Sequence, residues 1–100
     1  MADISWSYLG IPFVCDEDKR RVNLAKHAVD LVKASTAFAD PVQITVFDSQ
    51  HSDGEDRFTM LGKNDADVLL RISFTMRGDT VRLISARKAT KSEGKLYGTY

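Results

Sequence analysis

The spacing of apolar residues changes once along the chain, and this change divides the sequence into a helical part and a strand part. Between residues 16 and 38, apolar residues recur every three or four positions, which is the period of an amphipathic helix. From residue 42 onward they largely alternate with polar residues, which is typical of half-buried strands. The pattern therefore predicts helices first and strands afterwards.

Two helices are expected before residue 40. Asp16 is a suitable N-cap and acidic residues follow it, so the first helix is expected to run to about His27. Asp30 is expected to cap a second short helix over residues 31–38, and Pro41 ends helical structure. On a helical wheel, one half of the first helix carries the apolar residues Val22, Leu24, Ala25, Ala28 and Val29.

A short strand is expected over residues 13–15, and a run of longer strands follows the helices. These longer strands cover residues 42–47, 57–61, 68–77 and 80–86. Within residues 68–77, alternate positions place one set of apolar side chains on the same face, namely Val68, Leu70, Ile72, Phe74 and Met76. A last helix is expected over residues 90–97, although Gly94 weakens it.

The short connections between the longer strands favour antiparallel pairing. The sequence thus predicts an α+β fold: N-terminal helices, then an antiparallel sheet of about four strands with helices on one face, then a C-terminal helix. Residues 1–12, with Gly10 and Pro12, are expected to form an N-terminal extension. Residues 13–100 are expected to form one domain, since 100 residues suit a single compact core.

The formal net charge of zero hides an uneven distribution. Residues 1–56 contain five Lys or Arg against ten Asp or Glu, whereas residues 57–100 contain nine against four. The basic half can offer a phosphate-binding face, or its charges can simply be solvated surface. No apolar run is long enough for a transmembrane helix, the N-terminus lacks the basic start of a signal peptide, and the single Cys15 fits a reducing compartment. We therefore expect a cytoplasmic protein without a membrane partner.

The sequence lacks the usual spacings of metal and cofactor sites. The histidines His27 and His51 form no cluster with Cys15 that suits zinc, and the acidic residues of 48–56 do not follow the calcium-loop spacing. No Gly-rich phosphate loop is present. We expect neither a metal nor a cofactor.

A set of acidic and basic side chains is compatible with RNA cleavage without a metal. That reaction needs a base for the 2′-hydroxyl, a cation for the crowded phosphate and an acid for the leaving 5′-oxygen. Glu55, His27 or His51 can act as base or acid, and arginines suit the phosphate because a guanidinium binds two oxygens at once. Glu55 alternates with Arg57, which is expected to place both on one face of a strand. Each residue also has a structural interpretation, since Glu55 can merely pair with Arg57 and His27 can merely cap a helix.

Several short stretches, taken in order, resemble the BrnT family of ribonuclease toxins from about Phe13 to Tyr97. The longest is Arg-Leu-Ile-Ser-Ala-Arg-Lys-Ala-Thr at residues 82–90. The others are Asn-Leu-Ala-Lys-His at 23–27, Phe-Ala-Asp-Pro at 38–41, His-Ser-Asp-Gly-Glu-Asp-Arg at 51–57, Leu-Gly at 61–62, Thr-Met-Arg-Gly at 75–78, and the single residues Glu93 and Tyr97. Each stretch alone is weak, but the ordered set is specific.

The resemblance implies a RelE-like fold and a metal-independent endoribonuclease that arrests growth. It also implies a BrnA-type antitoxin as partner and RNA as substrate, with room for a higher-order toxin–antitoxin complex. Carried over by position, the candidates are the catalytic residues Glu55, Arg77, His27 and Lys26, and the RNA phosphate-binding residues Arg57, Arg82 and Arg87. Glu55 is expected to act as the base, Arg77 and Arg87 to bind phosphate, and His27 or Lys26 to act as acid or electrostatic support.

The chain departs from the family pattern at two positions and in its extra N-terminal segment, residues 1–12. Cys15 stands where the family usually has Trp, and Trp6 lies too far upstream to replace it. Ala28 stands where Gly is common, and a left-handed helix end costs Ala about 1 kcal/mol more than Gly. These departures motivate an alternative function, a catalytically inactive toxin-like module that only binds an antitoxin or RNA. A plain RNA-binding domain is a third hypothesis.

Overall fold

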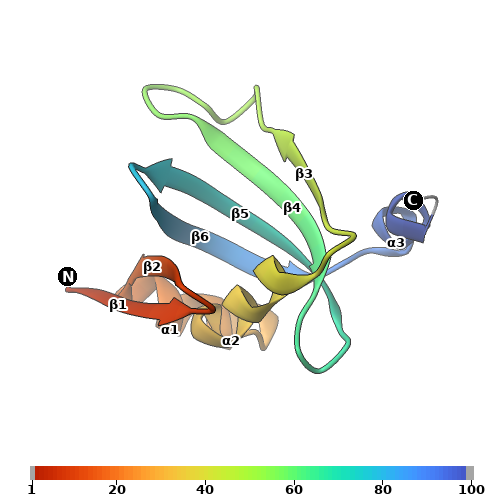
Figure 1. Ribbon diagram of the computed structural model, residues 1–100, viewed down its shortest axis with the longest axis horizontal. Helices are drawn as coiled ribbons and strands as arrows, with labels where there is room; N and C mark the ends of the chain where they lie inside the picture. The colour runs from red at the N-terminus through yellow and green to blue at the C-terminus, as the bar shows by residue number, and fades with distance from the viewer. Residues whose placement is uncertain (1, 99–100) are drawn as a thin grey trace.

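The computed structural model describes residues 2–98. The chain begins with a hairpin of β1 (Asp3–Tyr8) and β2 (Ile11–Asp16), which leads into α1 (Glu17–His27), α2 (Leu31–Ala34) and the 3₁₀ helix η1 (Ser35–Ala39). The strands β3 (Ile44–Phe47), β4 (Arg57–Lys63), β5 (Leu69–Arg77) and β6 (Thr80–Lys88) follow, and then helix α3 (Lys91–Gly98). Figure 1 shows a single twisted sheet, with α3 set apart at one end.

The described strands form one six-stranded sheet in the order β1-β2-β6-β5-β4-β3. Neighbouring strands are antiparallel except for β2 and β6, which run parallel with Phe13 beside Val81 and Val14 beside Arg82. This parallel pair joins the N-terminal hairpin to the last strand, so segments from opposite ends of the sequence lie side by side (Figure 1).

One face of the sheet carries the hydrophobic core. Ile72 and Phe74 of β5 point to this face, together with Met60 of β4 and Leu83 of β6. The segment of α2 and η1 covers the face with the small or aliphatic side chains of Leu31, Ala34 and Ala37. Gly62 of β4 permits this close packing, because a Cβ at that position would lie 3.1 Å from the carbonyl oxygen of Ala37.

Helix α1 lies along the edge of β6, where Asn23 fixes it. The Asn23 side chain donates to the carbonyl oxygen of Ala86 at 2.8 Å and accepts from its N–H at 3.0 Å, the two bonds that a neighbouring strand would make. Asn23 is 5% exposed, whereas Val22 and Leu24 are 61% and 50% exposed. The apolar half seen on the helical wheel therefore stays largely in solvent, because hydrogen bonds to β6 set the rotation of the helix.

The opposite face of the sheet carries most of the polar strand residues, together with a few apolar ones such as Leu61, which lies beside Arg71. We define the polar face by the side chains that share it, which are Arg57 and Thr59 of β4, Arg71, Ser73, Thr75 and Arg77 of β5, and Arg82, Ser85 and Arg87 of β6. A register shift between Ser73 and Phe74 lets β6 keep both its apolar and its polar residues on the correct faces of the sheet.

The structure confirms the α+β class and the C-terminal helix, but it corrects the order and number of elements. The described chain starts with strands and not with helices, and the sheet has six strands with one parallel pair. Residues 3–8 form β1, whose Ile4, Trp6 and Tyr8 pack against the core. The predicted helix over residues 31–38 becomes 3₁₀ after Ala34, and Met76 is 42% exposed although it alternates with core residues.

Candidate functional site

Arginines gather on the polar face near the turn between β5 and β6. Arg57 lies beside Thr75, and Thr75 lies beside Arg82, so a threonine separates two arginines in one row across three strands. Thr75 is 2% exposed and donates its hydroxyl to the carbonyl oxygen of Asp56 at 2.6 Å, which holds the end of the preceding loop against β5. Arg77 ends β5 next to this row.

Glu55 joins these arginines from the loop before β4. The expectation that it shares a strand with Arg57 is wrong, because β4 begins at Arg57 itself. The Glu55 Oε2 accepts from the Nε of Arg77 at 2.9 Å, and both side chains remain about half exposed. This hydrogen bond, with the charges of Arg77, Arg82 and Arg57, holds the pKa of Glu55 below its usual value. Its carboxylate is therefore ionised at neutral pH.

Arg82 has a partner that the sequence did not reveal. The carboxylate oxygens of Asp3 in β1 accept from the two terminal nitrogens of Arg82, at 2.9 and 3.0 Å. Arg57, in contrast, makes no side-chain hydrogen bond or ion pair with any residue between 2 and 98. We call Asp3, Glu55, Arg57, Arg77 and Arg82 the hairpin-end cluster.

A second ionic cluster lies at the other end of the polar face. The carboxylate of Glu93 in α3 accepts from the two terminal nitrogens of Arg87 at 2.8 and 3.0 Å, and its Oε2 lies 3.5 Å from the Nε of Arg71. The N–H of Thr90 also donates to Glu93 at 2.8 Å. The hydrogen bond from Arg87 is the main cause that lowers the pKa of Glu93 to about 2. Arg71, Arg87 and Glu93 form the helix-end cluster.

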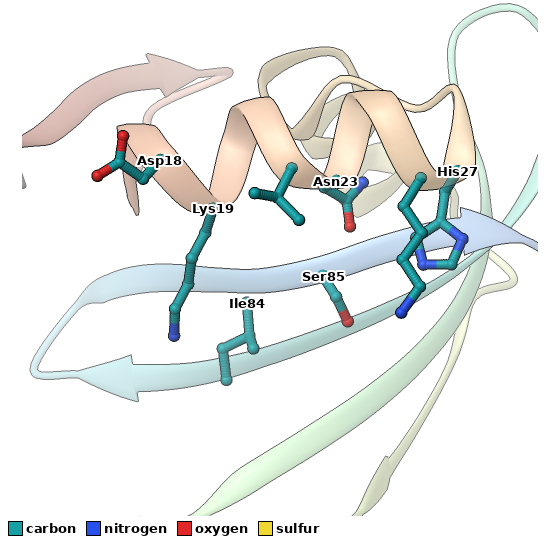
Figure 2. Close-up of a pocket in the computed structure, with 8 residues that line it drawn as sticks. Asp18, Lys19, Asn23, His27, Ile84 and Ser85 are labelled. Carbon is teal, nitrogen blue, oxygen red and sulfur yellow. The ribbon is translucent and has the colours of Figure 1, made fainter.

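Lys26 and His27 lie in a third place, a groove of about 280 Å³ between α1 and β6. Lys19 and Asn23 line the same groove from α1, and Ser85 lines it from the polar face. Figure 2 shows the side chains of Lys19 and His27 extending from α1 toward β6. Asp18 also lines the groove, so Lys19 and Lys26 leave it one net positive charge along this edge of the polar face.

The predicted site residues are therefore divided and not joined in one constellation. Glu55, Arg57, Arg77 and Arg82 meet in the hairpin-end cluster, whereas Arg87 belongs to the helix-end cluster. Ser85, the floor of the groove, lies beside Ser73, which is four residues or roughly 13 Å from Arg77 along β5. Lys26 and His27 thus lie well apart from Glu55 along the sheet.

His51 lies near the β3 edge of the sheet. Its Nδ1 is 2.9 Å from the Oδ2 of Asp48, and it shares a pocket of about 320 Å³ with Thr59 and Arg71. The sequence suggests His51 as a candidate acid or base, whereas Asp48 and Arg71 are not among the predicted site residues. Alternation along β5 places Arg71 on the same face as Arg77, and this pattern could have identified Arg71 from the sequence.

Other kinds of site receive less support from the described residues. Among residues 2–98, no three His, Cys, Asp or Glu side chains come together in a way that suits a metal ion. No helix in this part of the chain is long and apolar enough to cross a membrane. Cys15 is buried, and burial raises the pKa of its thiol to about 11, so the thiol stays protonated at neutral pH.

Comparison with protein families gives one match over most of the chain. The family described as the ribonuclease toxin BrnT of type II toxin-antitoxin systems matches residues 15–93. The chain belongs to this family. All the predicted site residues lie within the matched span, whereas β1 and its Asp3 lie outside it.

A solved structure supports the fold of this BrnT-family chain. The chain resembles the crystal structure of the Brucella abortus ribonuclease toxin BrnT, with a TM-score of 0.57 and 22% sequence identity. The similarity covers 77% of this chain and 94% of that chain. A comparison with curated protein sequences gives no match. At this identity the likeness establishes the shared fold.

Proposed function

We propose that this BrnT-family chain is a metal-independent endoribonuclease toxin that cleaves RNA in the cytoplasm and arrests growth. The observation that carries the proposal is the hairpin-end cluster, in which the ionised carboxylate of Glu55 is hydrogen-bonded to Arg77 and is also influenced by the charges of Arg82 and Arg57. This arrangement offers a proton acceptor beside cations that suit a phosphate. Membership of a ribonuclease toxin family supports the same conclusion.

The residue roles follow from the chemistry of the cluster. Glu55 takes the proton of a 2′-hydroxyl, and the 2′-oxygen attacks the adjacent phosphorus. Arg57, Arg77 and Arg82 bind the phosphate oxygens, whose charge increases in the transition state. The phosphorus–5′-oxygen bond breaks, and the leaving oxygen takes up a proton from a water molecule. The products carry a 2′,3′-cyclic phosphate and a 5′-hydroxyl.

The remaining candidates act outside this cluster. Lys26 and His27 line the groove at Ser85, roughly 13 Å along the sheet from Arg77, where they give electrostatic support to a neighbouring part of the RNA. A phosphate role for Arg87 requires that Glu93 release it, because both of its terminal nitrogens are engaged.

The protein partner follows from the type II toxin-antitoxin family. We propose a BrnA-type antitoxin that binds the toxin and suppresses cleavage, with assembly into a higher-order toxin–antitoxin complex. Co-expression with such an antitoxin should restore growth, and the two proteins should elute together in size-exclusion chromatography.

The decisive experiment combines RNA cleavage with growth. Purified protein should fragment cellular RNA in the presence of EDTA, with 5′-hydroxyl ends on the products, and induced expression should stop growth. Glu55→Gln and Arg77→Ala should each slow cleavage by about 100-fold or more. The controls Asp53→Asn, in the same loop as Glu55, and Arg21→Ala, an exposed arginine of α1, should stay within about two-fold of the parent.

The outcomes separate the function from the site. Intact RNA at high concentrations of the parent protein would contradict the ribonuclease proposal. Cleavage that survives both Glu55→Gln and Arg77→Ala would leave the function standing and overturn the site assignment.

A binding module without catalysis is the second candidate, and a specific observation favours it. Two of the three arginines in the hairpin-end cluster already have carboxylate partners, which reduces their attraction for phosphate. Such a module would bind an antitoxin or RNA tightly and leave RNA uncut in every cleavage assay.

A further inference from the structure

Strand β1 is an addition to the part of the chain that matches the BrnT family, and it is firmly attached. It pairs with β2 along its whole length, from Asp3 beside Asp16 to Tyr8 beside Ile11. Trp6 stacks on Phe13 with ring centroids 5.7 Å apart and donates its indole N–H to the Ser35 hydroxyl at 3.0 Å. These contacts make the position of Asp3 a fixed feature of the fold.

The fixed strand brings Asp3 to the guanidinium of Arg82. The two side chains form a two-pronged ion pair, with distances of 2.9 and 3.0 Å. Arg82 is only 20% exposed while Asp3 is 51% exposed, so the carboxylate lies on the solvent side of the pair. The hydrogen bond between them lowers the pKa of Asp3 and raises that of Arg82. Asp3 thus occupies the two nitrogens that a phosphate would use.

The charges near Arg82 decide whether a phosphate can compete with Asp3 for its guanidinium. Within the hairpin-end cluster, the guanidinium groups of Arg57, Arg77 and Arg82 face the carboxylates of Asp3 and Glu55, which leaves one positive charge. Asp16 also lies near enough to interact with Arg82, but its carboxylate accepts from the Lys19 N–H at the start of α1. Asp3 is therefore the carboxylate that directly opposes a phosphate at Arg82.

We propose that Asp3 is part of the RNA-binding site and sets its affinity: it holds Arg82 in the free protein and yields Arg82 to an RNA phosphate when RNA binds. The inference rests on the proposed function, because it takes Arg82 to be a phosphate ligand. The carboxylate of Asp3 is half exposed, so another anion can approach this pair from solvent and replace it, and the carboxylate keeps the guanidinium oriented until then.

The test measures the affinity of a nuclease-resistant RNA. A 2′-O-methyl oligoribonucleotide of mixed sequence lacks the attacking hydroxyl, so binding is measured without cleavage. Asp3→Asn keeps the size of the side chain and removes its charge. It should bind this probe about two- to five-fold more tightly than the parent at low salt. The slope of log affinity against log salt should steepen by up to about 0.7, the contribution of one phosphate contact on a single strand.

Asp79→Asn is the matched control. Asp79 lies in the turn between β5 and β6, at the same end of the sheet, and its substitution changes the net charge equally. Its side chain has no hydrogen bond or ion pair with residues 2–98. It should strengthen binding less than Asp3→Asn does, since it removes an equal charge that makes no direct bond to Arg82. Thermal unfolding of both variants checks that the hairpin of β1 and β2 is intact.

The outcomes distinguish the two levels of the proposal. Weaker binding by Asp3→Asn, or an effect no larger than that of Asp79→Asn, would overturn the role of Asp3. Arg82→Ala should weaken binding by about five-fold or more. If Arg82→Ala binds as the parent does, Arg82 is not a phosphate ligand, and the proposed function loses that residue together with Asp3. If the parent protein does not bind the probe, the RNA-binding proposal itself fails.

Discussion

The two ionic clusters of the polar face use the same chemistry in different settings. In the helix-end cluster, Glu93 and Arg87 are 22% and 32% exposed, and the pair joins α3 to β6. In the hairpin-end cluster, Glu55 and Arg77 are 45% and 56% exposed, and Arg57 has no ionic partner within residues 2–98. One cluster is largely closed around its carboxylate, whereas the other presents donors to solvent.

This difference indicates that arginines on one face of a sheet need not form a single functional site. A half-buried pair with several hydrogen bonds to one carboxylate stabilises the fold, because separating it leaves polar groups unsatisfied. An exposed pair contributes little to stability and can exchange partners with a ligand. The comparison predicts that substitutions in the hairpin-end cluster change activity, while those in the helix-end cluster change stability.

The largest effect is expected from an alanine at the unpaired arginine. Arg57→Ala should lower the rate of RNA cleavage by about 100- to 1000-fold, because it removes a donor to the transition-state phosphate. Its free energy of unfolding should stay within about 0.5 kcal/mol of the parent. Arg87→Ala, measured in the same cleavage and urea-denaturation assays, should show the reverse pattern. Equal loss of activity in both variants would break the distinction between the clusters.

A smaller effect is expected from the carboxylate of the helix-end cluster. Glu93→Gln should lower the free energy of unfolding by about 2 kcal/mol, since Arg87 and Arg71 lose a charged acceptor that is mostly shielded from water. Glu55→Gln is the matched substitution at the exposed end and should change stability by less than about 0.5 kcal/mol. Comparable destabilisation by both substitutions would show that exposure does not separate the two pairs.

The carboxylate of Glu93 also makes the stability of the protein depend on pH. The pKa of Glu93 is lowered to about 2 in the folded protein, so its contribution is fully present above its ordinary pKa and disappears as the pH falls toward 2. The difference in unfolding free energy between the parent and Glu93→Gln should therefore shrink between about pH 4.5 and pH 2. Denaturation series at several pH values measure it, and a constant difference would argue against the ion pair.

The smallest effect concerns the other attachment of α3. The Tyr97 hydroxyl donates to the Oδ2 of Asp40 at 2.5 Å, and this hydrogen bond raises the pKa of Tyr97 to about 12. Tyr97→Phe should lower the free energy of unfolding by about 1 kcal/mol at neutral pH. The raised pKa means that this stabilisation is present below pH 10 and is lost as the pH rises through 12. If the difference in unfolding free energy between the parent and Tyr97→Phe persists unchanged at high pH, the phenol proton does not contribute to stability.

Local signals predicted much of the helical part correctly. Asp16 caps α1 by accepting from the Lys19 N–H at 3.0 Å, and Asp30 caps α2 by accepting from the Val32 N–H at 3.2 Å. Helix α1 ends at His27, and Ala28 adopts the left-handed conformation with φ of 58° that the family pattern suggested. Caps depend on residues within a few positions, which is why the sequence reveals them.

Features that depend on distant residues could not be predicted in the same way. The rotation of α1 depends on hydrogen bonds between Asn23 and Ala86, and no helical wheel contains that information. Strand β1 alternates polar and apolar residues, yet its role follows from pairing with β2 and from the contact of Asp3 with Arg82. Chemical type suggested the arginines and Glu55 as candidates, but only the register of β4, β5 and β6 separates Arg87 from Arg77.

The parallel pairing of β2 with β6 also has a consequence for how the chain folds. Phe13 must find Val81, so this pairing closes a loop that contains most of the sequence, while β5 and β6 are joined by a two-residue turn. Loop closure of this length slows folding, whereas a tight hairpin forms quickly. During synthesis the hairpin of β1 and β2 emerges from the ribosome before β6, so its neighbouring strand in the sheet is absent until β6 has emerged. We therefore expect β1 and β2 to join the sheet late, and the contact of Asp3 with Arg82 to be among the last to form.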